Sequence, residues 1–182
     1  STLAVYVFSS LPLFLLMGEF ANISRMTEDA YRATHTWIGE FRGGLATSSI
    51  LGAALFSTVS GVSISCAAVM CRIALPQLLE RGYKPSLATG ALAAGGTLGE
   101  LVPPGTLFIF YAIMSETSIG KLFIASVFPG IILTFMYGIQ IYIQCKLDPS
   151  LGPPGIHASW KQKLFAFNKM WMFALLFLLV LG

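Results

Sequence analysis

The feature that most constrains this chain is a long apolar segment, residues 87–115, with helix-breaking residues near its centre. It reads LATGALAAGGTLGELVPPGTLFIFYAIMS and places two adjacent prolines, Pro103 and Pro104, beside a carboxylate, Glu100. Crossing the ~30 Å hydrocarbon core of a membrane takes about 20 helical residues, so the segment is long enough to cross. Because proline removes a backbone donor and clashes with the preceding turn, we expect the helix to break over residues 99–105.

The composition is that of a membrane protein. Of the 182 residues, 55% are hydrophobic and 10% are charged, with a mean hydropathy of +0.77, whereas soluble domains average roughly 25% charged residues. Apolar runs recur along the whole sequence, so we expect an all-α polytopic membrane protein rather than a single anchor. The net charge of +3 includes no basic tract, which argues against a nucleic-acid partner.

The order of apolar, charged and helix-breaking residues predicts the layout of the chain. Residues 43–80 contain two apolar arms around a small-residue tip, and an arm of about 15 residues spans only ~22 Å. A re-entrant hairpin is therefore expected, with two short complete crossings as the alternative. Lys and Arg gather at one set of helix ends, which the positive-inside rule assigns to the cytoplasm. The expected segments are a transmembrane helix at 1–23, an interfacial amphipathic arm at 24–42, the hairpin at 43–80 with its tip at 60–63, a broken transmembrane helix at 86–114, a transmembrane helix at 118–145, a cytoplasmic loop at 146–168 and a truncated transmembrane helix at 169–182. The last helix is too short to span, so we expect a fragment of a longer chain.

A helix break at mid-membrane leaves backbone groups without partners, and each unsatisfied group costs several kcal/mol in hydrocarbon. Freed carbonyls suit a hard cation, and the N-terminal ends of half-helices suit an anionic group. The hairpin tip carries the hydroxyls of Ser60, Ser63 and Ser65 beside Gly61, so two breaks that face each other would make one site. The alternatives are a simple proline kink and glycines that serve only close helix packing.

Four collinear stretches of the sequence carry a resemblance to a known family. They are PLFLLMGEF at 12–20, SGVSISCAA at 60–68, RIALPQLLERGYKPSLATGALAAGGTLGELVPPG at 72–105 and TSIGKLFIASVFPGIIL at 117–133. They resemble the large membrane subunit (DctM type) of tripartite ATP-independent periplasmic (TRAP) transporters. The resemblance implies one of two inverted repeats of an elevator-type, sodium-coupled importer of small organic acids in a bacterial or archaeal cytoplasmic (inner) membrane. The implied partners are the lipid bilayer, a small membrane subunit, a periplasmic substrate-binding protein and the remaining half of the large subunit.

The resemblance also implies the residues of the site. Na⁺ would be the coupling ion, with no other cofactor, and would be bound mainly by backbone carbonyls of Ser60, Gly61, Ser63, Gly96, Gly99, Val102 and Pro104. The wider substrate and ion site would include Pro103 of the same break and, on the residue types alone rather than on the resemblance, Ser65, Thr97 and Glu100. The sequence departs from the family pattern at three positions, because Val62 replaces a serine of the usual S-G-S-S tip, Glu100 stands where an apolar residue is usual and Gly105 where a serine is frequent.

Glu100 is the residue that physical chemistry singles out, since a charge at mid-membrane is costly. Three interpretations are open: a carboxylate that couples transport to sodium or protons, a partner for a basic group such as Arg72 or one in the missing half of the protein, or a side chain that reaches a hydrated cavity without a role. An anionic substrate would be repelled by this carboxylate unless it were protonated or paired. This raises the hypothesis of a substrate with a cationic group.

Other functions also fit parts of the pattern. Within transport, the alternatives are a stand-alone hairpin-bearing dicarboxylate or citrate-type carrier and a proton-coupled carrier that uses Glu100. Outside transport, the alternative is a structural or assembly subunit of a membrane complex. An enzyme is not expected, because no second catalytic acid lies at a plausible spacing from Glu100 or Glu19.

Overall fold

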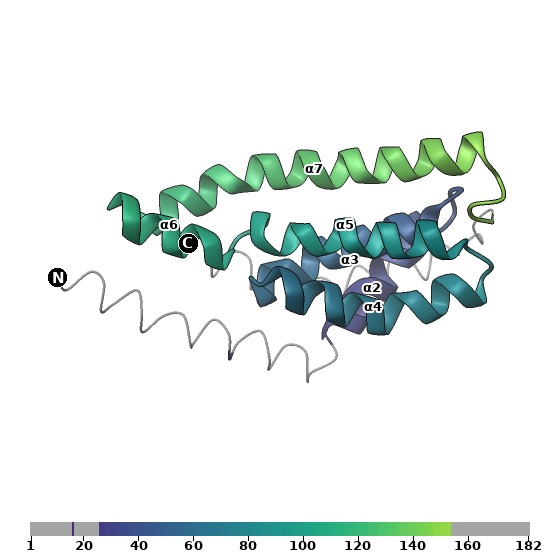
Figure 1. Ribbon diagram of the computed structural model, residues 1–182, viewed down its shortest axis with the longest axis horizontal. Coiled ribbons are helices and arrows are strands. Elements are labelled where there is room, and N and C mark those ends of the chain that lie inside the picture. The colour runs from purple at the N-terminus through teal and green to yellow at the C-terminus, as the bar shows by residue number, and fades with distance from the viewer. Residues whose placement is uncertain (1–15, 17–25, 154–182) are drawn as a thin grey trace.

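The computed structural model describes residue 16 and residues 26–153, and all regular elements longer than one residue in that part of the chain are helices (Figure 1). Three expected segments lie wholly or partly outside the described residues. They are the helix at 1–23 (except Leu16), the C-terminal part of the loop at 146–168 and the helix at 169–182. Three described segments are long and apolar enough to cross a membrane: Ser63–Glu80, Pro85–Ser115 and Ile119–Leu147. The helices are α2 (Met26–Ile38), α3 (Gly44–Ser60), α4 (Ser63–Glu80), α5 (Pro85–Leu101), α6 (Thr106–Ser115) and α7 (Ile119–Leu147).

Helices α3 and α4 form the hairpin, and they turn at residues 61–62. Gly61 ends α3 in the left-handed conformation, with φ 60°, and its N–H donates to the Ser57 carbonyl over 3.0 Å. Glycine adopts this conformation without the steric cost that a Cβ imposes. The turn therefore falls within the tip expected at 60–63, while the re-entrant position of the hairpin in the membrane stays a prediction.

The core lies between the hairpin and α5. Most of α3 is buried, whereas α4 buries a single stripe made of Cys66, Met70, Ala74 and Leu78. This spacing of four residues follows one face of a helix. Helix α5 packs against both arms of the hairpin and against α7 (Figure 1). Its small residues allow this close approach, which is how helices pack in lipid.

The outer faces of α6 and α7 expose large apolar side chains. Phe110, Met114, Phe128 and Phe135 are 46%, 87%, 72% and 67% exposed. A protein surface in water rarely presents so many together. These faces are suited to contact with lipid or with a further apolar segment.

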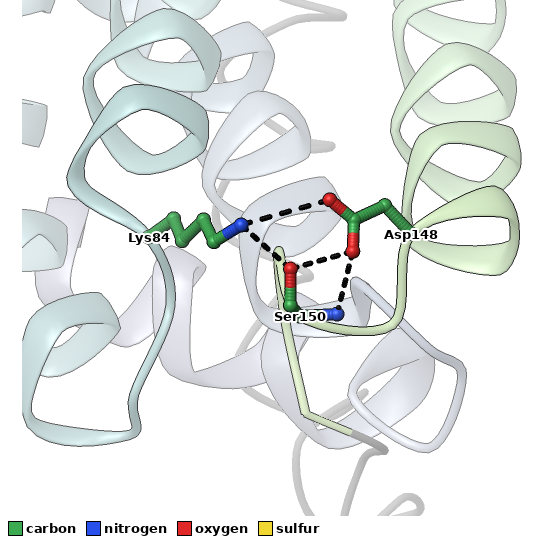
Figure 2. A network of polar contacts seen from close by, with 3 residues as sticks. All are labelled: Lys84, Asp148 and Ser150. Atoms are coloured by element: carbon green, nitrogen blue, oxygen red, sulfur yellow. Dashed lines mark hydrogen bonds and ion pairs between the residues drawn. The ribbon is translucent and has the colours of Figure 1, made fainter.

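A polar network ties the turn between α4 and α5 to the end of α7 (Figure 2). The Lys84 ammonium donates to the Ser150 hydroxyl over 2.6 Å and lies 3.6 Å from the Asp148 carboxylate. Ser150 in turn donates its N–H and its hydroxyl to Asp148. These hydrogen bonds, with the nearby Lys84 charge, lower the pKa of Asp148. The network fixes the end of the bundle opposite the hairpin tip (Figure 1).

Candidate functional site

The helix break lies between α5 and α6. Helix α5 ends at Leu101, and Val102 has an extended conformation with φ −81° and ψ 124°, as expected for a residue before proline. The peptide bond between Pro103 and Pro104 is cis. Because α5 ends at Leu101 and α6 begins only at Thr106, the interruption is real unwinding rather than a simple kink. Helix α5 continues to Leu101, past the expected start of the break at residue 99.

The unwound segment leaves carbonyl groups without helical donors. The last backbone hydrogen bond of α5 runs from the Val102 N–H to the Leu98 carbonyl over 2.9 Å. The carbonyls of Gly99 and Glu100 would normally accept from residues 103 and 104, which are prolines and have no N–H. Carbonyl oxygens in this situation are the ligand type that a hard cation takes.

The tip of the hairpin docks in this break. The Gly61 carbonyl accepts a hydrogen bond from the N–H of Thr106, the first residue of α6, over 3.0 Å. Gly61 also lies directly against the Pro104 carbonyl oxygen, which a Cβ on Gly61 would overlap. The two interruptions of helical structure, distant in sequence, therefore face each other where α3 and α5 end, and α6 continues beyond this point (Figure 1).

The first turn of α4 lies on a glycine surface of α5. The Ser63 hydroxyl donates to the Gly96 carbonyl over 2.7 Å. A Cβ on Gly99 would lie 2.7 Å from the Ser63 Cα, closer than real Cβ atoms approach backbone. The glycines of this segment thus serve close packing and, through the same contacts, bring a hydroxyl and several carbonyls of the site together.

Glu100 connects the N-terminal ends of two helices. Its carboxylate accepts from the Ser63 N–H at the start of α4 over 3.2 Å. It also accepts from the Leu107 N–H over 3.3 Å and from the Thr106 hydroxyl over 3.2 Å, both at the start of α6. The first N–H groups of a helix have no intrahelical acceptor, and negative charge there is favourable. The carboxylate of Glu100, which belongs to α5, therefore caps both α4 and α6.

The residues that precede α4 and α6 do not cap these helices with their own side chains. Val62 and Gly105 are the N-cap residues of α4 and α6, and neither makes a side-chain capping hydrogen bond. Serine is among the residues preferred at an N-cap because its oxygen accepts from the first turn. Valine and glycine side chains have no such oxygen, and Glu100 supplies the acceptor at the start of both helices.

The remaining candidate residues take different places. Ser60 is buried at the end of α3, and Ser65 is half-buried in the first turn of α4. Neither hydroxyl joins the contacts across the break among the described residues. Thr97 is exposed, donates to the Ala94 carbonyl and lies 3.3 Å from the Tyr137 hydroxyl of α7, so it faces α7 rather than the hairpin tip.

The interpretation that pairs Glu100 with Arg72 is not realised among the described residues. Arg72 is exposed on α4, and every partner of Glu100 in this part of the chain is an N–H or hydroxyl group. Sequence reasoning missed Thr106 and Leu107 as members of the site. Their position directly after the double proline, at the start of a half-helix, was the available indication.

The fold and the site define an all-helical polytopic membrane protein with a broken helix, an architecture in which secondary transporters bind substrate and ions. The family model described as the DctM component of the tripartite ATP-independent periplasmic transporter matches residues 1–182. The chain belongs to this family. Its relatives are named as transporter permeases and not as enzymes.

Three curated relatives illustrate the range of the family. The C4-dicarboxylate TRAP transporter large permease protein DctM of Pseudomonas aeruginosa is 33% identical over 97% of this chain. The sialic acid TRAP transporter large permease protein SiaM of Vibrio cholerae is 30% identical over 75% of it, and the ectoine TRAP transporter large permease protein TeaC of Halomonas elongata is 29% identical over 86%. This chain spans 41%, 32% and 36% of the lengths of these proteins, respectively.

Proposed function

We propose that this chain is part of the large permease subunit of a transporter that imports small organic acids across a bacterial or archaeal inner membrane. The names of its relatives support this class of substrate, since they specify C4-dicarboxylates, sialic acid and ectoine. The remaining part of the large subunit would complete the site, because the chain covers 41% of its relative from Pseudomonas aeruginosa. A small membrane subunit and a periplasmic substrate-binding protein would be the other partners.

Sodium is the proposed coupling ion, and it would bind where the hairpin tip meets the helix break. The observation that carries this proposal is the docking of Gly61 against Pro104 and Thr106. Around this contact lie the Ser63 hydroxyl and carbonyls whose helical donors the prolines remove. The ligand set consists of oxygen atoms, which suits a hard monovalent cation better than a soft metal.

The proposed transport step moves the hairpin and the broken helix together. Contacts from Gly61 to Thr106, from Ser63 to Gly96 and from Glu100 to the first turns of α4 and α6 join the hairpin, α5 and α6 into one unit. Such a unit could move as a rigid body against the rest of the protein, exposing the site alternately to the two sides of the membrane. A bound cation would stabilise the docked tip by adding ligand contacts to both sides of the break.

Reconstitution of the complete transporter tests this function. The full-length large subunit, its small subunit and its binding protein would be combined in proteoliposomes, with radiolabelled succinate, sialic acid and ectoine offered in turn. Uptake of one of them is expected only with an inward sodium gradient and with all three components present. Uptake that persists in choline, or without the binding protein, would contradict the proposed coupling or the proposed tripartite assembly, respectively.

A further inference from the structure

The starting observation is a carboxylate that already fills the meeting point of two helix N-termini. Glu100 receives hydrogen bonds from the Ser63 N–H of α4 and from the Leu107 N–H of α6, at 3.2 and 3.3 Å. The Thr106 hydroxyl approaches both of its carboxylate oxygens, at 3.4 and 3.2 Å. Two α-helices of 18 and 10 residues thus direct their positive ends at one half-buried side chain.

Within the described part of the chain, the negative charge of Glu100 is compensated by the two helix N-termini rather than by a basic side chain. Helix N-termini carry a partial positive charge, and two that converge form a place where an external carboxylate would otherwise bind. Among the described residues no Lys, Arg or His forms an ion pair with Glu100, whose partners are uncharged N–H and O–H groups. The Glu100 carboxylate therefore compensates the partial positive charge of both helix ends.

We propose that Glu100 is a specificity-determining residue. Its carboxylate occupies the place where the N-termini of α4 and α6 converge, and it excludes a carboxylate of the substrate from that place. The part of the substrate that lies at this break is then neutral or cationic, as in a zwitterion. A substrate carboxylate at this place would be repelled by the Glu100 carboxylate at short range. This inference rests on the proposed transport function. It goes beyond that function because it states which charge the substrate presents to this half of the site.

A chemical rescue experiment tests whether the position is an anion site. The full-length large and small subunits would be purified together, and the melting temperature would be measured with potassium acetate or with its neutral analogue acetamide. Glu100→Ala removes the carboxylate, so acetate, but not acetamide, is expected to raise its melting temperature by several degrees. The wild type and Glu80→Ala, which removes an exposed glutamate at the end of α4, are expected to show no such difference. Equal effects of acetate and acetamide on folded Glu100→Ala would overturn the proposal.

A second experiment separates the charge of Glu100 from its capping role. Glu100→Gln keeps an oxygen acceptor for the helix N–H groups and removes the charge, and it also covers the case in which the alanine variant fails to fold. Succinate and the zwitterion glycine betaine would be titrated against the purified membrane subunits, without the binding protein, whose own selectivity would mask the effect. The ratio of their half-saturating concentrations is expected to shift at least tenfold towards succinate in Glu100→Gln.

The outcomes of this titration are distinct from those of the uptake assay. An unchanged ratio in Glu100→Gln would mean that Glu100 only caps the two helices, and it would overturn the specificity proposal. Wild-type uptake that does not depend on sodium would contradict the proposed function. It would not affect the interpretation of the acetate experiment. Succinate that binds the wild type more tightly than betaine, with the same ratio in Glu100→Gln, would also overturn the specificity proposal.

Discussion

Replacing Gly61 by alanine perturbs the contact between the hairpin tip and the helix break. Gly61 has φ 60°, a left-handed conformation that costs a non-glycine residue about 1 to 2 kcal/mol. An added Cβ would also overlap the Pro104 carbonyl oxygen, and such overpacking costs about 1 to 3 kcal/mol more. Pro103 and Pro104 are fully buried, so we expect the tip rather than the break to move. The hydrogen bond from Thr106 to Gly61 would then lengthen or be lost.

Gly82, in the turn between α4 and α5, provides a matched control. It also has a positive φ, 80°, but a Cβ at this position would meet nothing within 4 Å. Gly82→Ala therefore carries the conformational cost without the overlap. The difference between the two variants isolates about 1 to 3 kcal/mol for tip docking, which corresponds to about a 5- to 150-fold change in the docking equilibrium.

Sodium dependence of uptake is the assay for this difference. In proteoliposomes with the full-length large subunit and its partners, Gly61→Ala is expected to raise the half-saturating sodium concentration about 5- to 150-fold relative to Gly82→Ala. Thermal melting in detergent verifies that both variants are folded. The same sodium dependence in two folded variants would refute the argument that the docked tip forms the ion site.

Three further changes test other contacts of the structure. Gly99→Ala places a Cβ 2.7 Å from the Ser63 Cα and is expected to cost about 1 to 3 kcal/mol, seen as a lower melting temperature, whereas Gly90→Ala, with nothing within 4 Å, is expected to be neutral or stabilising. Ser63→Ala removes the hydroxyl that donates to Gly96 and is expected to cost about 1 kcal/mol, or roughly fivefold in half-saturating sodium; an unchanged value would remove this hydroxyl from the site. The lowered pKa of Asp148 means that its stabilising interactions are present above its unfolded pKa of about 3.9 and are lost as pH falls through the lower folded value. The melting difference between wild type and Asp148→Asn should stay constant from pH 8 to 5 and shrink below that range, and a decline already between pH 7 and 6 would contradict the assignment.

The positions of the helix interruptions could be predicted from the sequence because glycine and proline act on their own backbone. Pro103 and Pro104 lack the N–H groups that would continue α5, and Gly61 permits the left-handed turn that ends α3. These effects need no knowledge of the fold. The exact start of the break was less accessible, since residues 99–101 keep helical partners behind them and their glycine content does not by itself unwind the helix.

The contacts of the site could not be predicted in the same way. Whether position 100 faces Arg72, water or a helix terminus depends on how α4, α5 and α6 pack, and their packing is set by contacts distant in sequence. The same holds for Thr97, which lies one residue from Gly96 but on the side of α5 that faces α7. Residue type identified Glu100 as unusual, whereas only the arrangement of the two helix N-termini explains its partners.

Direct binding of radioactive sodium to the purified full-length large subunit, together with its small subunit, tests whether the hairpin tip and the helix break form one ion site. We expect saturable binding in the wild type and in Gly82→Ala, and weaker sodium binding in Gly61→Ala, where an added Cβ overlaps the Pro104 carbonyl oxygen and disfavours docking of the tip. Equal sodium binding by all three proteins would contradict the claim that the hairpin tip and the helix break form one ion site.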